Sequence, residues 1–286
     1  MNTQFWVIQV FNGVSYGALL FLVGSGLSLI FGVMRIVNLS HGSYFMLGGY
    51  IALSVISATG SWALSIPLAA LAVAVIGLLM ERVFLRPLGF DPLRQVLLTV
   101  GFAFLFQQAA LDIWGGNNMD ITPPAVLTRS IVVGGVYLPT YRMFMIGLAL
   151  AIGLALWLVI EKTRVGAAVR ATVDDAQMAR GVGIDTNRIS MLIFALGAFL
   201  AAVGGVIGGA FLGVFPGLDF EMLPLAFAVV IIGGMGSLSG AAIGALLVGL
   251  ADNFGKALFP EISYFTLYAP MVLILAVKPT GLFGRE

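Results

Sequence analysis

Long apolar runs alternate with short polar segments along almost the whole chain. The first run, from Phe5 to Phe31, contains no charged residue. A membrane-spanning helix needs about 20 apolar residues, so this run is long enough to cross a bilayer with some tilt. Similar runs predict further helices at 44–56, 63–80, 96–113, 143–160, 189–215 and 265–277.

Two stretches are less regular. The apolar runs 225–232 and 241–250 are short and are joined by GGMGSLSG, so they are either full crossings or a re-entrant pair. Between residues 114 and 142, pairs of Asn, Pro and Gly predict a surface loop with a small hairpin. The whole pattern predicts an all-α polytopic membrane bundle of about eight or nine transmembrane helices, organised as one transmembrane domain over residues 1–286.

The segment 161–188 concentrates charge between two apolar runs, with five of the 14 Lys and Arg residues and four acidic residues. Small or apolar residues recur in it at a helical spacing, which predicts a short amphipathic helix at the membrane surface. Gly181, Gly183 and the polar run 185–187 end that helix. The segment is either an ordinary solvated loop or a docking site for a partner protein. The residues of its apolar stripe are Val165, Ala168, Val169, Thr172, Ala176 and Ala179.

Composition supports the membrane interpretation and removes several kinds of chemistry. Hydrophobic residues make up 60% of the chain and charged residues 9%, against about 25% charged residues in soluble domains. The absence of cysteine excludes disulfides and thiol catalysis, and the single histidine excludes a His-rich metal site. The chain also lacks the phosphate-binding GxxxxGK loop, HExxH and GxSxG. We therefore expect no catalytic residue, no metal, no cofactor and no ATP hydrolysis by this chain.

Acidic residues are poorly placed for ion-coupled transport. A proton pump or an ion-coupled carrier usually carries acidic groups at mid-membrane depth. Four acidic residues of this chain fall near the ends of predicted spans, and only Asp252 is expected to lie deeper in the membrane. These four are Asp112, Asp219, Glu221 and Glu261.

The distribution of basic residues predicts an orientation. With alternating spans, eleven of the 14 Lys and Arg residues share one face with the segment 161–188. Cytoplasmic loops are enriched in Lys and Arg, so this face is predicted to be cytoplasmic, with the N-terminus outside and the C-terminus in the cytoplasm. The eleven are Arg35, Arg82, Arg86, Arg94, Lys162, Arg164, Arg170, Arg180, Arg188, Lys278 and Arg285; the other three are Arg129, Arg142 and Lys256.

Glycine and alanine recur every four residues within the predicted helix 189–215. Such a stripe lets another helix approach closely, and Gly236, Gly240 and Gly244 repeat the pattern. Ordinary tight packing and a pore-lining or moving interface both fit it. The first stripe consists of Gly197, Ala201, Gly205, Gly209 and Gly213.

Three blocks of the sequence resemble the permease subunits of branched-chain amino acid ABC transporters. They are GVMRIVNLSHGSYFMLGGYIA, TRVGAAVRATVDDAQMARGVGIDTNRI and IIGGMGSLSGAAIGALLVG. The first block is closer to the H-type subunit than to the M-type. The resemblance implies a permease that works in the bacterial inner membrane, surrounded by lipid, with a second (M-type) permease, two cytoplasmic ATPase subunits and a periplasmic substrate-binding protein. It implies no nucleic-acid partner.

The resemblance also assigns candidate sites. It makes 161–188 the cytoplasmic coupling segment that fits a groove on the ATPase. Ala167 and Ala168 stand where relatives often carry a basic residue and another small one, which leaves the docking expected but any single ion pair open. The residues that match the family's coupling motif are Arg164, Gly166, Arg170, Ala171, Asp174, Ala179, Gly183 and Ile184.

The translocation path is expected at the first and third blocks. A helix interrupted at depth exposes backbone groups, which is tolerable only where protein or water covers them, and broken helices line substrate paths in other carriers. The alternative for the first block is a helix cap by Asn38 or Ser40, and for the third a tight crossing rather than half of an internal repeat. The candidate path residues are Asn38, Ser40, His41, Gly42, Gly234, Gly236 and Ser237.

The expected function is import of branched-chain or other small amino acids, driven by the partner ATPases. With apolar walls carrying a few hydroxyls and glycines, selection is expected to rest on the external binding protein. Import of urea or short amides by the same architecture, and a self-sufficient secondary carrier or channel, remain as alternatives.

Overall fold

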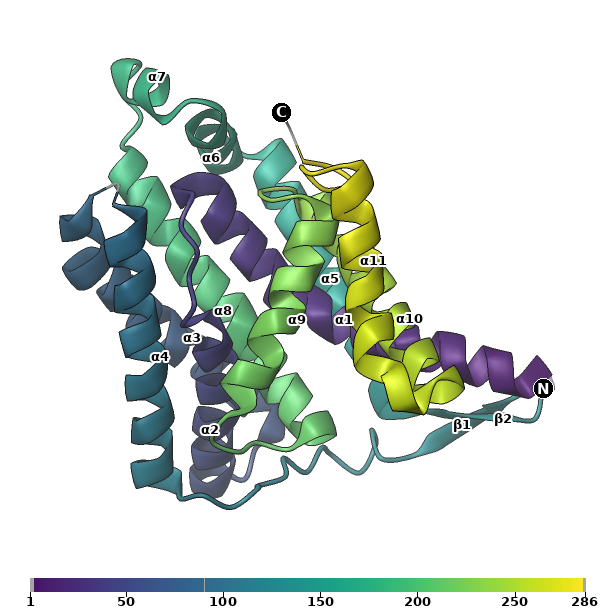
Figure 1. Cartoon of the computed structure of the whole chain (residues 1–286). Coiled ribbons are helices and arrows are strands. Elements are labelled where there is room, and N and C mark those ends of the chain that lie inside the picture. The colour runs from purple at the N-terminus through teal and green to yellow at the C-terminus, as the bar shows by residue number, and fades with distance from the viewer. Residues whose placement is uncertain (1–2, 90, 285–286) are drawn as a thin grey trace.

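A computed structural model describes residues 3–89 and 91–284 as a helical bundle with one short hairpin (Figure 1). Seven helices in this described part are long and apolar enough to cross a membrane, which confirms the predicted polytopic all-α bundle. They are α1 (Thr3–Met34), α2 (His41–Thr59), α3 (Trp62–Met80) with its extensions η1 (Glu81–Leu85) and η2 (Arg86–Leu88), α4 (Pro92–Trp114), α5 (Thr140–Lys162), α8 (Thr186–Leu212) and α10 (Leu238–Leu258).

Two further apolar helices are shorter. α9 (Leu218–Gly233) has 16 residues and α11 (Ser263–Val277) has 15; the 3-10 turn η3 (Pro260–Ile262) precedes α11. Counting one or both of these shorter helices with the seven gives the predicted eight or nine crossings. α10 has 21 residues and is long enough to cross a membrane, which favours a full crossing over half of a re-entrant pair for the run 241–250.

Side chains in the sequence set several helix starts. Ser61, Asp91 and Ser237 each accept a hydrogen bond from the backbone N–H three residues ahead, at 3.0–3.3 Å. Each bond satisfies a donor that the first helical turn leaves without a partner. These caps fix where α3, α4 and α10 begin.

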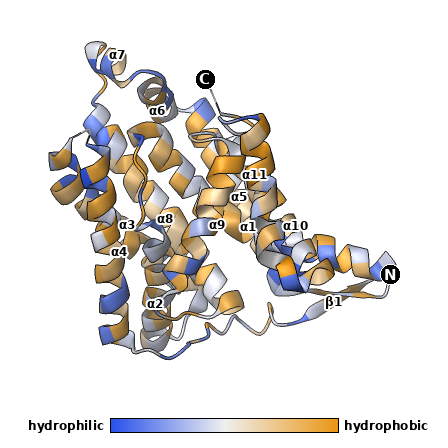
Figure 2. Cartoon of the chain, viewed as in Figure 1, coloured by the Kyte–Doolittle hydropathy of each residue, from blue (hydrophilic) through white to orange (hydrophobic). Residues whose placement is uncertain are grey.

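α1 and α8 form the centre of the bundle, while α4 and α5 lie at its periphery. Buried residues make up 78% of the most apolar part of α1 and 72% of that of α8, but only 17% in α4 and in α5. The peripheral helices therefore turn most of their apolar surface outward. Apolar residues dominate along the helices, and hydrophilic ones gather mainly toward the ends of the bundle (Figure 2).

Close approach of α8 to its neighbours depends on glycine. A Cβ atom on Gly197 would collide with the Ile30 side chain of α1, and one on Gly205 would overlap the Phe45 carbonyl oxygen of α2. The small residues of this stripe therefore pack against two different helices, α1 and α2, and not against one. Gly213 does not belong to it, because α8 ends at Leu212 and Gly213 has φ +79°.

The region between α4 and α5 contains the hairpin that the sequence predicts. Strands β1 (Ser130–Val133) and β2 (Val136–Pro139) pair antiparallel through Gly134 and Gly135. The loop before them lies across the end of α8, because Met119 and Val214 exchange backbone hydrogen bonds of 2.7 and 2.9 Å. This pairing explains why α8 stops short of the predicted residue 215.

The elements that carry the eleven clustered basic residues meet at one end of the bundle. The end of α1, η1 and η2, the start of α4, the segment between α5 and α8, and the end of α11 all lie there (Figure 1). Arg285 lies outside the described residues. The other three basic residues, Arg129, Arg142 and Lys256, lie at the opposite end of the bundle, where α5 starts and α10 ends.

Candidate functional site

The charged segment projects beyond this end as two short helices, α6 (Arg164–Asp174) and α7 (Ala176–Gly181) (Figure 1). The prediction of one helix is wrong because the backbone is extended at Asp175, with φ −153° and ψ 102°. The Asp175 carboxylate then accepts hydrogen bonds from the N–H groups of Gln177 and Met178 at 2.8 and 2.9 Å. A new helix therefore starts at the break.

Gly166 and Arg170 attach α6 to the end of α5. A Cβ atom on Gly166 would overlap the carbonyl oxygens of Val159 and Ile160, so only glycine allows this contact. The Arg170 guanidinium donates to the Ile160 carbonyl and lies 3.6 Å from the Glu161 carboxylate. These two candidate residues position the projection: the Gly166 backbone and the Arg170 side chain contact this chain.

The apolar stripe of the projection mostly faces the bundle. Val169, Thr172 and Ala179 are buried, and Val169 packs with Ile189 and Ile193 of α8. Among the candidate coupling residues, Gly166 and Ala179 are buried, Arg170, Ala171 and Ile184 are half-buried, and Arg164, Asp174 and Gly183 are exposed. The stripe therefore anchors the projection instead of offering it to a partner.

The exposed apolar surface of the projection lies elsewhere. Met178 and Val182 are 68% and 73% exposed; within the stripe only Val165, at the start of α6, is exposed, at 53%. Sequence reasoning missed Met178 and Val182 because they lie out of phase with the stripe of small residues. An isolated exposed apolar residue is ordinary, but two of them beside α7, at the tip of a projection, give that tip an apolar surface.

The first predicted path block forms the linker between α1 and α2, and α2 starts inside the bundle. His41 Nε2 lies 3.0 Å from the Val23 carbonyl oxygen, and the Leu39 N–H donates to Thr99 Oγ1 at 3.2 Å. Val23 is eleven residues before the end of α1, which is about 16 Å at 1.5 Å per residue. α2 therefore begins well inside the bundle and not at the level where α1 ends.

Side chains satisfy part of the interrupted backbone. Asn38 Oδ1 accepts hydrogen bonds from the Ser40 N–H at 3.1 Å and from the Ser40 hydroxyl at 2.7 Å. The Ser40 hydroxyl therefore does not cap α2. Asn38, Ser40 and His41 are fully buried, and neither Asn38 Nδ2 nor His41 Nδ1 has a hydrogen-bond partner. In this conformation these residues lie within protein, not beside an open passage.

α9 also begins at this depth, against the start of α2. The Ser43 hydroxyl donates to Asp219 Oδ2 at 2.9 Å, and a Cβ atom on Gly42 would overlap the Asp219 carbonyl oxygen. Asp219 is the second residue of α9 and so lies near a helix end, as predicted, but it is only 2% exposed because α9 starts inside the bundle. A carboxylate in the first turn complements the positive end of the helix dipole. Two helix N-termini thus meet around one buried acid.

The third block is the turn between α9 and α10, at the same end of the bundle as the projection (Figure 1). Gly234 ends α9, Gly236 lies against Gly32 of α1 with φ +80°, and Ser237 caps α10. Gly236 thus contacts the start of the first block at Gly32, whereas the candidate path residues Asn38, Ser40, His41 and Gly42 lie at the buried start of α2. The turn is a tight crossing at a helix end.

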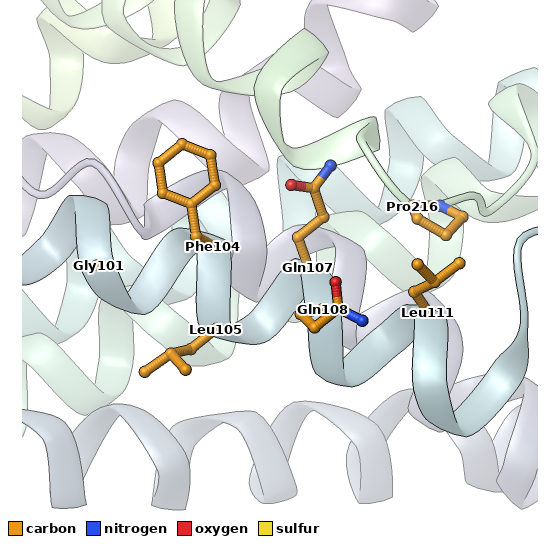
Figure 3. Close-up of a pocket in the computed structure, with 7 residues that line it drawn as sticks. All are labelled: Gly101, Phe104, Leu105, Gln107, Gln108, Leu111 and Pro216. Carbon is orange, nitrogen blue, oxygen red and sulfur yellow. The ribbon is translucent and has the colours of Figure 1, made fainter.

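A cavity of about 580 Å³ lies between α4 and the turn that precedes α9. Phe104, Gln107 and Leu111 extend from α4 to one side, where Pro216 lies (Figure 3). Gln108 lines the same cavity, and its amide donates to Asp112 at 2.9 Å. Sequence reasoning missed both glutamines, although adjacent amides inside the predicted span 96–113 are a detectable departure from its apolar pattern.

Membrane-length helices that break inside the bundle are an architecture of transport proteins. The family described as branched-chain amino acid transport system permease components matches residues 9–275, and the chain belongs to this family. It is 32% identical to the BraD permease protein of Pseudomonas aeruginosa, over 97% of this chain and 95% of BraD. It is 31% identical to the LivH permease protein of Escherichia coli K12, over 100% of this chain and 98% of LivH.

The predicted similarity to the H-type subunit is confirmed. Identity to the LivM permease protein of Escherichia coli K12 is 27%, over 91% of this chain and 67% of LivM, which is lower than for LivH. These relatives are named as permease proteins of high-affinity branched-chain amino acid transport systems. No solved structure gave a significant match.

Proposed function

We propose that the chain is a permease subunit of an ABC importer that moves branched-chain or other small amino acids across the inner membrane. One permease domain spans residues 1–286 and works with a second, M-type permease. Two cytoplasmic ATPase subunits hydrolyse ATP, and a periplasmic binding protein delivers the substrate. The observation that carries the proposal is the anchored projection of α6 and α7, together with full-length similarity to LivH and BraD.

The projection suits a coupling role because it is firmly attached at both ends. Gly166 and Arg170 hold α6 on α5, while the buried Ala179 holds α7 near α8. Movement of a protein bound at Met178 and Val182 would therefore pass into two membrane helices. In this proposal Arg164, Asp174 and Gly183 contact the ATPase, and Gly166, Arg170, Ala171, Ala179 and Ile184 set the position of that surface.

The meeting point of α2 and α9 suits a moving part of the path. Asn38, Ser40, His41 and Gly42 lie at the break in the helical backbone, where polar groups are only partly paired. We assign Gly234, Gly236 and Ser237 to the hinge end of α9. With the projection in the cytoplasm, the N-terminus lies outside and the C-terminus inside, as the positive-inside rule requires.

Reconstitution tests this function. The chain is placed in liposomes with and without its ATPase and second permease, and uptake of L-leucine, acetamide and urea is measured with the binding protein outside. We expect ATP-dependent uptake of L-leucine by the complete assembly only. Uphill uptake by the chain alone would identify a secondary carrier, and uptake of urea or acetamide instead of L-leucine would change the cargo.

A further inference from the structure

The mostly apolar cavity beside α4 contains two amide side chains from within an apolar helix of membrane length. Gln107 and Gln108 lie fifteen and sixteen residues into a 23-residue apolar helix, and the exposed Asp112 follows one turn later. Polar side chains inside a membrane span almost always face a bundle interior or a water-filled space. This face of α4 therefore faces water or protein in the assembled transporter.

The cavity has the volume of a small-molecule site and is open to the outside along α4. Its volume of about 580 Å³ falls within the roughly 300–1,000 Å³ that is usual for ligand pockets. Phe104, Leu105 and Leu111 supply apolar walls, and the two glutamines supply uncharged polar groups. Each amide has N–H donors for a carboxylate and a carbonyl acceptor for an ammonium group.

The wall of the cavity opposite α4 is the turn before α9, the helix whose start we propose moves during transport. Pro216 precedes α9, and Gln107 Nε2 would lie 3.6 Å from a Cβ atom on Gly217. One turn nearer the start of α4, the ring of Phe104 contacts that of Phe220, with 5.5 Å between the centroids. A shift of α9 would therefore change the glutamine site and the aromatic contact next to it together.

We propose that Gln107 and Gln108 form a transient binding station for the carboxylate and ammonium groups of a zwitterionic amino acid on the translocation path. The inference rests on the proposed function and goes beyond it, because it locates the substrate within this chain. Gln108 donates to Asp112 and so keeps its carbonyl free for an ammonium group, while Gln107 offers its N–H groups to the carboxylate. Uncharged ligands bind a zwitterion weakly enough to release it, which passage requires.

The test uses the fact that the chain contains no cysteine. Gln107→Cys and Gln108→Cys are introduced separately, and the complete transporter is treated from outside with a membrane-impermeant maleimide. Labelling of this chain is followed with and without L-leucine, and with urea, which has neither a carboxylate nor an ammonium group, as the comparison solute. Leu150→Cys is the matched control, because Leu150 is 69% exposed on α5 and lies away from the cavity.

We expect both glutamine positions to be labelled, L-leucine to slow the labelling severalfold, urea to leave it unchanged, and Leu150→Cys to resist the reagent. Equal labelling with and without L-leucine would overturn the station. The station would also be overturned if neither cysteine were labelled and both could be cross-linked to the second permease, because this face of α4 would then be a contact between subunits. Labelling and protection need no ATP, so a failure of ATP-driven uptake would refute the proposed function without changing this result.

Discussion

The junction of α2 with α9 and the tip of the α6–α7 projection contrast in polarity with their surroundings. The junction is polar within an apolar bundle, and the tip is apolar within a charged segment. The junction buries Asp219, Asn38 and His41 inside an apolar bundle. The tip exposes Met178 and Val182 beside the most charged segment of the chain. Buried polar groups are costly unless they are paired, so the junction depends on contacts within the chain. The tip needs none, so its apolar residues are available to a partner.

The substitution with the largest expected effect disrupts the close packing of α8 against α2 near the junction. Gly205→Leu would force α8 away from α2, because even a Cβ atom at Gly205 overlaps the Phe45 backbone. We expect loss of about 3 kcal/mol or more, the upper range for overpacking, and little folded protein. Monodispersity and thermal unfolding in detergent measure it.

Gly147→Leu is the control for this substitution, since Gly147 lies on α5 with no atom within 4 Å of an added Cβ. We expect this variant to fold normally. Equal yields and unfolding temperatures for the two variants would show that α8 and α2 are not held at the observed distance.

The junction itself is tested by Ser43→Ala. This change removes the hydroxyl that donates to Asp219 Oδ2 and leaves a buried acid with one partner fewer. Hydrogen bonds to charged groups contribute about 1.5–3 kcal/mol, so we expect a stability loss in that range. Asp219→Asn, which still accepts from Ser43, is expected to lose less. If Ser43→Ala unfolds at the parental temperature, the contact does not hold α2 to α9.

The sequence predicts the bundle well because twenty apolar residues in a row have few alternatives in a membrane. It also identifies the break before His41 and the charged segment. It does not predict the depth of Asp219, because that depends on where a short α9 starts, which is set by its contact with Ser43 and Gly42.

The outward direction of the projection is likewise not contained in the sequence pattern. A stripe of small residues fits docking and anchoring equally well. Only the position of α6 on α5, fixed by Gly166 and Arg170, turns Val169 inward and leaves Met178 exposed. The two glutamines of α4 were visible in the sequence, but nothing in it indicates that they face a cavity.

The tip is tested by Met178→Asp combined with Val182→Asp. Both side chains are highly exposed, so folding should be unchanged, whereas an apolar contact with the ATPase would be lost. Truncation of central interface residues costs more than about 1 kcal/mol, so we expect at least about a tenfold weaker association with the ATPase, measured by titration of the purified subunits.

Val126→Asp provides the matched control for the tip. Val126 is also 73% exposed, but it lies in the loop at the opposite end of the bundle. We expect the parental affinity for the ATPase. An unchanged affinity in the double variant would move the docking surface away from α7.

The smallest expected effect concerns Arg170, which attaches the projection to the end of α5. Arg170→Ala removes the bond to the Ile160 carbonyl and a partly exposed ion pair with Glu161. Exposed ion pairs contribute about 0–1 kcal/mol, so stability should fall little. Arg188→Ala is the control, since Arg188 is 80% exposed and pairs with Asp185.

Because Arg170 fixes α6 on α5 without presenting its charge outward, its loss should leave ATPase binding intact and loosen the transmission of movement. We expect Arg170→Ala to hydrolyse more ATP per L-leucine transported in proteoliposomes, by a few-fold, and Arg188→Ala to keep the parental ratio. Arg170→Ala with weaker ATPase binding and an unchanged ratio would show that the guanidinium contacts the partner. An unchanged ratio and unchanged binding would leave the Gly166 contact as the sole attachment that matters, because that contact alone would then carry the movement of α6 into the bundle.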